Sequence, residues 1–89
     1  MPARRLIITG KVQGVFYRAN AKKEADMLGL KGWVRNMDAG SVEAHIEGTE
    51  EAVKEFITWA HRGSEMSEVA SVSVKEYFEE SLTTFDVVM

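Results

Sequence analysis

The pattern of hydrophobic and polar positions in the first half of the chain predicts a strand, a helix and a second strand. Residues 5–12 are rich in β-branched and aliphatic side chains and stop at Gln13-Gly14, as a strand does before a turn. From Tyr17 to Leu28 hydrophobic residues recur at helical spacing, and Gly29 is placed to end that helix in a left-handed cap. Residues 32–37 are expected to form the second strand.

The second half of the chain predicts a strand, a helix, another strand and a short last strand. Hydrophobic residues alternate with polar ones over residues 42–47, which predicts a strand with one face exposed to water. Glu43, His45 and Glu47 are expected on that exposed face. Thr49 is a candidate N-cap, and a hydrophobic stripe follows it until Gly63. Alternation returns around Val72 and Val74, and Phe85 and Val87 indicate a last strand.

The order of these elements predicts the architecture. Right-handed crossovers in two strand–helix–strand units give a ferredoxin-like βαββαβ sandwich of the α+β class. We expect a mostly antiparallel sheet of four to five strands with two helices on one face, formed by residues 1–89 as a single domain. Because this fold hosts many unrelated activities, it does not indicate the function.

Composition narrows the functional classes. The chain has no cysteine, which removes disulfides, thiolate metal sites and cysteine nucleophiles. Its net charge of −3 gives no overall positive field for nucleic acid or an anionic membrane, so any anion site has to be local. No apolar run reaches the roughly 18 residues of a membrane span, and the N-terminus is too poor in apolar residues for a signal peptide. We expect a cytoplasmic monomer.

The segment from Gly10 to Arg18 (GKVQGVFYR) is the candidate anion site, because it leads from a strand into a helix N-terminus. The first N–H groups of a helix lack internal partners, and Gly14 permits the positive φ that a nest of such groups needs. Arg18 adds a planar, permanent charge that matches two phosphate oxygens. Taken alone, a loop glycine more often serves a turn, and an arginine in a first turn is more often solvated. The expected backbone cradle comprises Gln13, Gly14, Val15, Phe16 and Tyr17.

A second motif ends in Asn36. The run Gly32-Trp33-Val34-Arg35-Asn36 is followed by Gly40 and then by Val42-Glu43. An asparagine that ends a strand before a turn usually caps its own backbone. On its own, therefore, Asn36 carries little functional information.

Together the two motifs resemble the acylphosphatase family, whose signature is G-x-V-Q-G-V-x-[FY]-R followed by G-x-V-x-N, a turn glycine and V-E. The resemblance covers essentially the whole chain. It implies the ferredoxin-like sandwich, Arg18 as the phosphate-binding residue, Asn36 as the residue that orients the attacking water, and no metal or organic cofactor. Ala39 departs from the commoner aspartate before Gly40, which bears on the rigidity of that turn more than on catalysis.

The implied reaction cleaves a carboxyl–phosphate bond to give a carboxylate and inorganic phosphate. The leaving carboxylate has a pKa of about 4 and departs without a general acid, and positioning and charge stabilisation carry most of phosphoryl transfer. We expect water to attack phosphorus without a metal or a covalent intermediate, and its proton to leave late. We expect structural or solvated roles for His45 and His61. The sequence shows no specificity pocket for the acyl part of the substrate, so we expect the enzyme to accept a broad range of acyl groups.

Two other classes remain as alternatives. A non-catalytic anion-binding module would keep Arg18 but tolerate the loss of Asn36, so the presence of both favours an enzyme. An RNA-binding sheet shares this element order but needs exposed aromatic residues on its central strands. Residues 5–12 and 42–47 contain none, and the protein is acidic.

Overall fold

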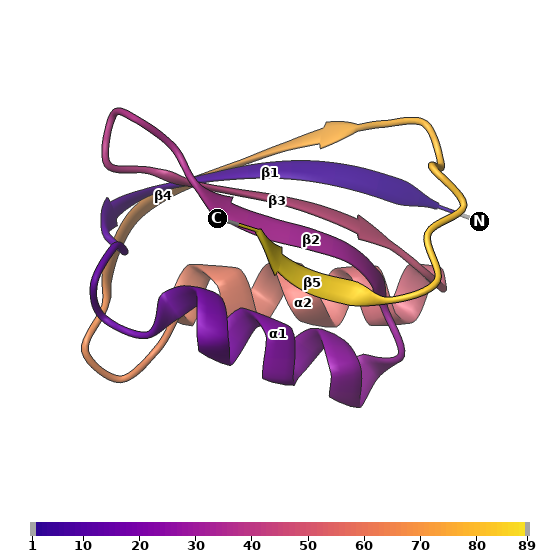
Figure 1. The fold of residues 1–89 in the computed structure, drawn as a ribbon, viewed down its shortest axis with the longest axis horizontal. Coiled ribbons are helices and arrows are strands. Elements are labelled where there is room, and N and C mark those ends of the chain that lie inside the picture. The colour runs from indigo at the N-terminus through magenta and orange to yellow at the C-terminus, as the bar shows by residue number, and fades with distance from the viewer. Residues whose placement is uncertain (1, 89) are drawn as a thin grey trace.

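The computed structural model describes residues 2–88, which form a two-layer sandwich (Figure 1). The strands assemble in the order β4-β1-β3-β2-β5, and every pairing is antiparallel except that of β2 with β5. The predicted α+β ferredoxin-like fold is therefore confirmed, with five strands. The elements are β1 (Ala3–Lys11), α1 (Tyr17–Leu28), β2 (Lys31–Asn36), β3 (Val42–Glu47), α2 (Glu50–Arg62), β4 (Glu68–Glu76) and β5 (Phe85–Val88).

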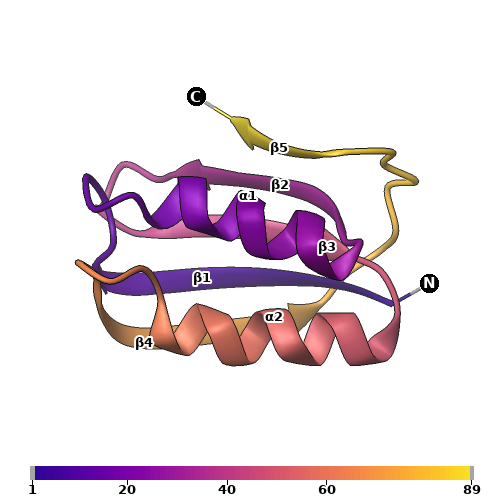
Figure 2. The same ribbon diagram turned by 90° about the horizontal axis from the view of Figure 1, so that it is seen from below.

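Both helices cover one face of the sheet and run in opposite directions (Figure 2). Helix α1 packs on β2 and β5, whereas α2 packs on β4 and β1. The N-terminus of α1 therefore lies at the end of the sheet where β2 turns into β3, and the N-terminus of α2 lies at the opposite end (Figures 1 and 2). None of the helices within residues 2–88 is long and apolar enough to cross a membrane.

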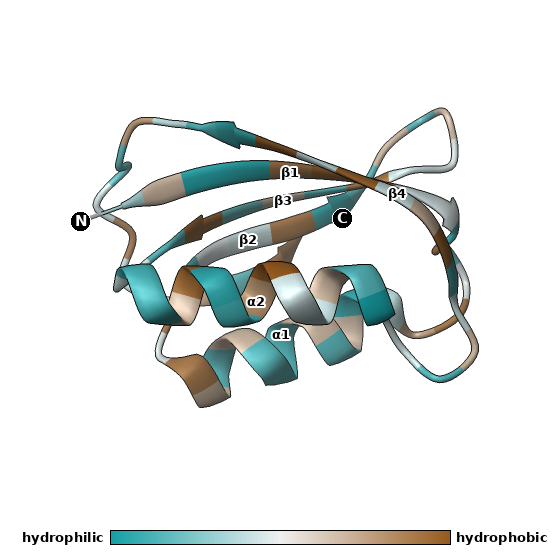
Figure 3. Ribbon diagram, turned by 180° about the vertical axis from the view of Figure 1, so that it is seen from behind, coloured by the Kyte–Doolittle hydropathy of each residue, from teal (hydrophilic) through white to brown (hydrophobic). Residues whose placement is uncertain are grey.

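The core lies between the helices and the sheet. Hydrophobic and hydrophilic residues alternate along both helices, as an amphipathic element with one buried face requires (Figure 3). Phe56 of α2 packs against Trp59 and Phe85, with ring centroids 5.7 and 6.2 Å away, so that α2 and β5 share one aromatic cluster. Burial of one such ring stabilises the fold by roughly 2–3 kcal/mol.

The strand before the first motif bends at Gly10. The register of β1 against β4 shifts between Thr9 and Gly10, and Gly10 has a φ of 118°. A Cβ at this position would overlap the backbone carbonyl oxygen of Glu68 on β4. Only glycine therefore fits here, and the bulge leads the chain toward α1.

The helix-free face of the sheet is not open to water along β3, contrary to the expectation for Glu43, His45 and Glu47. His45 is 0% and Glu47 is 3% exposed. The segment 77–84, between β4 and β5, covers them: the N–H groups of Glu80 and Leu82 donate to the Glu47 carboxylate. The face of the central strands that an RNA-binding sheet would present is thus partly covered.

Candidate active site

The loop between β1 and α1 adopts the backbone shape of an anion-binding nest. Gly14 has a φ of 74°, and Phe16 is also left-handed, with φ 62° and ψ 21°. For a residue with a Cβ this conformation costs roughly 1–2 kcal/mol. A bulky side chain in this region is an outlier that the surrounding structure has to stabilise.

Hydrogen bonds to its carbonyl groups hold this loop in place. The Ser64 hydroxyl donates to the Val15 carbonyl over 2.7 Å. The Phe16 carbonyl accepts from both the backbone N–H and the side-chain amide of Asn20, at 3.0 and 2.9 Å. Because these hydrogen bonds use carbonyl groups of the loop as acceptors, they hold the loop without involving its N–H groups.

The N–H groups of the loop stay available. The amides of residues 13–17 donate no hydrogen bond to any atom within residues 2–88. The N-cap residue of α1, Phe16, makes no side-chain capping hydrogen bond, and the first turn of the helix has no acidic residue. An open helix N-terminus combined with a glycine nest is an electropositive site for an anion.

Arg18 reaches the same site from the first turn of α1. It lines a hollow of about 300 Å³ together with Gly14, Phe16 and Ala19, and with Val12, Tyr17 and Val87. Its Nη1 donates to the Val88 carbonyl over a long 3.4 Å. No carboxylate within residues 2–88 pairs with Arg18, so the guanidinium can bind an exogenous anion.

Asn36 ends β2 at the same end of the sheet. It follows the buried Val34 by two residues, so it lies on the helix-facing side of the strand, and it is exposed. The preceding residue, Arg35, lies opposite Val88 in the parallel pairing of β2 with β5, and the Val88 carbonyl accepts the hydrogen bond from Arg18. The pairing of β2 with β5 therefore places Asn36 at the same end of the sheet as Arg18, although Asn36 is not among the residues that line the hollow of Arg18.

Gln13 joins the two motifs through its side chain. Its amide donates to the carbonyls of Met37 and Ser41, at 2.8 and 2.9 Å, on either side of the turn that follows Asn36. The sequence predicted only a backbone role for Gln13, because the carbonyls that accept from its side chain lie 24 and 28 residues away along the chain. The turn with Ala39 is also closed by two backbone hydrogen bonds, from the Met37 N–H to the Ser41 carbonyl at 2.8 Å and from the Gly40 N–H to the Met37 carbonyl at 3.2 Å.

Tyr17 contributes differently from its neighbours. Its side chain is 2% exposed, and its hydroxyl donates to the Ala60 carbonyl of α2 over 2.9 Å. Burial raises the pKa of this phenol far above its ordinary value. The ring thus joins the two helices, and only its backbone N–H faces the loop as a candidate ligand.

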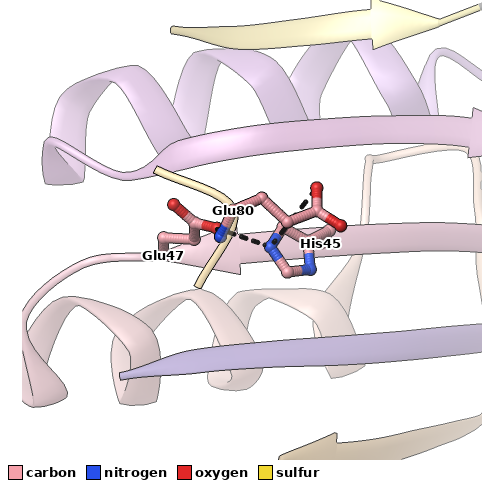
Figure 4. Close-up of side chains that lie close together, drawn as sticks. All are labelled: His45, Glu47 and Glu80. Carbon is pink, nitrogen blue, oxygen red and sulfur yellow. Dashed lines mark hydrogen bonds and ion pairs between the residues drawn. The ribbon is translucent and has the colours of Figure 1, made fainter. Parts of the chain in front are cut away.

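A second polar cluster lies on the helix-free face and combines His45, Glu47 and Glu80 (Figure 4). Their nearest donor atoms all lie within 4.8 Å of one another, a grouping that could hold a metal ion. His45 Nε2 already contacts a Glu47 oxygen at 2.8 Å, and His45 Nδ1 accepts from Arg5 Nε at 3.1 Å. Arg5 also pairs with Glu80 at 2.8 Å. A guanidinium therefore supplies the positive charge that this acidic group needs.

The Glu47 carboxylate is the centre of that cluster. Burial by itself would raise its pKa, but hydrogen bonds from the Glu80 N–H, the His45 ring and the Leu82 N–H bring the pKa below its ordinary value. The cluster therefore fixes segment 77–84 on the sheet. This cluster was not predicted from the sequence, because only the folded chain brings segment 77–84 to β3.

Comparison with known proteins agrees with the architecture and the motifs. A family model described as acylphosphatase matches residues 4–87. The acylphosphatase of Azoarcus sp. is 51% identical over 74 residues, which cover 83% of this chain and 76% of the relative. The acylphosphatase of Thermococcus kodakarensis is 48% identical over 83 residues, 93% of this chain and 91% of the relative.

Structural comparison leads to the same family. The crystal structure of acylphosphatase from Bacillus subtilis has a TM-score of 0.97 at 40% identity, and the match covers 100% of both chains. A structure of an acylphosphatase from Coxiella burnetii has a TM-score of 0.94 at 32% identity, covering 98% of this chain and 92% of that one. The protein therefore belongs to the acylphosphatase family and is an enzyme that hydrolyses acyl phosphates.

Proposed function

We propose that this enzyme transfers the phosphoryl group of an acyl phosphate directly to water in the hollow at the N-terminus of α1, with no metal and no covalent intermediate. The observation that carries the proposal is a loop and helix start that combine N–H groups and an arginine for which residues 2–88 supply neither a hydrogen-bond acceptor to the N–H groups nor a carboxylate to the arginine. A phosphoryl group has three non-bridging oxygens, and a nest of amides with one guanidinium offers enough donors for all of them.

Charge stabilisation is the first task of this site. The backbone amides of residues 13–17 and the fork of Arg18 bind the phosphoryl oxygens. Hydrogen bonds from Ser64 and Asn20 fix the loop in advance, so the donors need no reorganisation during the reaction. This arrangement binds inorganic phosphate, the product, through the same groups.

Positioning of water is the second task, and we assign it to Asn36. The residues that line the hollow include no histidine, aspartate, glutamate or lysine, and the Tyr17 hydroxyl is engaged by Ala60. No side chain of the hollow can therefore accept a full proton at neutral pH. The amide of Asn36 orients the water, and the proton leaves late, to a phosphoryl oxygen of the substrate.

The leaving group requires no assistance. A carboxylate with a pKa of about 4 departs as an anion near neutral pH. The histidines lie elsewhere: His45 is buried on the opposite face of the sheet, and His61 is exposed in the last turn of α2. The pH–rate profile should therefore show no titration that is lost when either histidine is replaced by glutamine.

The test is the hydrolysis of benzoyl phosphate in the presence of a chelator, in water enriched in oxygen-18. Wild type should release phosphate that carries the label, since the water attacks phosphorus rather than the carbonyl carbon. Asn36→Ala should lower kcat by about 10²-fold and leave inhibition by inorganic phosphate nearly unchanged, as a group used only in the transition state does. Label in benzoate, loss of activity with the chelator, or wild-type turnover by Asn36→Ala would contradict the proposal.

A further inference from the structure

Phe16 stands between two hollows on the surface of the enzyme. Its side chain is 75% exposed, although it is large and apolar and its backbone is left-handed. On one side it borders the hollow of Gly14 and Arg18. On the other side it borders a second hollow of about 330 Å³. The mechanism proposed above uses the backbone of Phe16 but leaves its ring without a role.

The second hollow, here called the rim pocket, is lined by Val15, Phe16, Asn20, Ser64, Glu65 and Met66. Its base is held by the hydrogen bond from Ser64 to Val15 and by one from the Ser67 hydroxyl to the Ser64 carbonyl, each 2.7 Å long. Met66 is 62% exposed, so a thioether and an aromatic ring both present apolar surface beside the phosphoryl site. Such a surface binds a flat apolar group well.

We propose that the rim pocket binds the acyl part of the substrate and gives the enzyme a preference for apolar, uncharged acyl groups of the benzoyl kind. This inference rests on the phosphoryl site proposed above. The rim pocket shares the wall of Phe16 with that site, so an acyl group bonded to a phosphate held there can reach it without a change of the fold. The sequence predicted that the enzyme accepts a broad range of acyl groups, and this proposal narrows that range.

The arrangement of the three loops at this end of the molecule agrees with an in-line reaction. The loop that carries the cradle lies between the turn after Asn36 and the connection 63–67 that follows α2 (Figures 1 and 2). Water positioned from the side of Asn36 therefore faces a leaving group directed toward the rim pocket. In-line displacement requires this opposition of the attacking and leaving oxygens.

The charge at the rim pocket selects against acidic acyl groups. Glu65 is exposed there, and no lysine or arginine is among the lining residues. A second carboxylate on the acyl part, as in succinyl phosphate, would meet a like charge and no cation. The enzyme should therefore hydrolyse succinyl phosphate with a lower kcat/KM than an uncharged acyl phosphate of similar length, such as butyryl phosphate.

The decisive experiment compares benzoyl with acetyl phosphate in two methionine variants. Met66→Ala should lower kcat/KM for benzoyl phosphate by about three- to tenfold and leave that for acetyl phosphate nearly unchanged. Met27 is 77% exposed in the last turns of α1, away from the rim pocket, so Met27→Ala is the matched control and should change neither. Equal effects of Met66→Ala on both substrates, or no effect on either, would overturn the proposal.

A charge variant supplies an independent readout. Glu65→Gln should raise kcat/KM for succinyl phosphate about two- to threefold relative to butyryl phosphate, and an unchanged ratio would contradict the charge argument. Inhibition by inorganic phosphate, measured in all variants, separates this inference from the proposed function. Arg18→Ala could abolish phosphate inhibition while Met66→Ala leaves the acyl preference unchanged. That result would support the phosphoryl site and contradict the acyl site. Phosphate inhibition that persists in Arg18→Ala would remove the phosphoryl site itself.

Discussion

The two helices of this enzyme begin in opposite ways, although each follows a strand in equivalent halves of the fold. The N-cap residue of α2 is Thr49, whose backbone is extended and whose hydroxyl accepts from the Ala52 N–H at 3.2 Å. Glu50 and Glu51 then face the positive end of its dipole. The N-cap residue of α1 is Phe16, whose backbone is left-handed and whose side chain makes no capping hydrogen bond, and no acidic residue follows in the first turn.

With the phosphoryl site proposed at the start of α1, this difference divides the fold into a half that contributes stability and a half to which we assign binding. A cap and two acidic residues satisfy a helix N-terminus with groups of the protein, which stabilises the helix and leaves nothing for a ligand. The N-terminus of α1 lacks these groups and keeps its N–H donors open. We interpret the strained backbone at the start of α1 as a loss of folding stability that keeps hydrogen-bond donors available for a phosphoryl group.

The largest expected effect follows from removal of the charge at the open N-terminus. Arg18→Ala should lower hydrolysis of benzoyl phosphate by at least about 10³-fold, because an arginine that stabilises phosphoryl transfer typically contributes that much. Arg18→Lys should recover little, since a point charge does not replace the planar fork. Steady-state kinetics and phosphate inhibition measure both variants. A lysine variant with near wild-type activity would show that charge alone, without geometry, suffices.

The next effect concerns stability at the α2 end of the sheet, where Glu47 lies two residues before the cap. Glu47→Gln should lower the free energy of unfolding by about 3 kcal/mol, because it leaves buried partners without their anion. Urea unfolding followed by tryptophan fluorescence measures the change. Glu43→Gln is the matched control: Glu43 pairs with Arg35 on the same face of β3 but nearer to solvent, and should cost about 1 kcal/mol or less.

The pH dependence of this loss has a defined sign. The folded state holds the pKa of Glu47 below its ordinary value of 4.5. The stability contributed by ionised Glu47 is therefore complete above that value and is lost as the pH falls through the lower, folded-state pKa. The gap in stability between wild type and Glu47→Gln should be widest near neutral pH and should narrow in acid. A gap that stayed constant down to pH 3 would contradict this role.

Glu47 also shows where sequence reasoning fails. Alternation over residues 42–47 correctly predicted the strand and its core face, because period-2 patterns report which side chains share a face. It wrongly predicted water on the other face, because a local pattern contains no information about a distant segment that returns to cover it. Segment 77–84 does so here, through N–H groups that any residue other than proline would supply.

The residues of the candidate site also fall into two groups, those with a local sequence signal and those whose roles depend on distant contacts. Gly14, Arg18 and Asn36 were predicted as site residues because each carries a local signal in the sequence. Glycine permits a positive φ, arginine carries a permanent charge, and the asparagine stands at the end of a predicted strand. Ser64, which fixes the loop, and Val88, which accepts from Arg18, were not predicted. Their roles depend on the approach of α2 and β5 to the loop. A serine hydroxyl and a backbone carbonyl have no sequence signature for such contacts.

A smaller effect should follow when α1 is given the acidic residue that α2 has. Ala19 lies in the first turn of α1, is exposed and lines the hollow. Ala19→Glu should stabilise the protein by about 0.5 kcal/mol through the helix dipole and weaken phosphate inhibition by about tenfold, since its carboxylate competes for the same field. Ala19→Gln, of equal size without charge, is the control. Phosphate inhibition equal in the two variants would mean that the dipole and amides contribute little.

The smallest effect is expected at the other helix and completes the comparison. Thr49→Ala removes the hydroxyl that accepts from the Ala52 N–H and should lower the free energy of unfolding by about 1 kcal/mol. Because α2 begins at the end of the sheet opposite the cradle (Figure 2), kcat and phosphate inhibition should not change. Thr49→Ser keeps the oxygen and should restore most of the lost stability. If Thr49→Ala impaired catalysis while the protein stayed folded, the two helix starts could not be separate in function, and the division between a binding end and a stabilising end would be wrong.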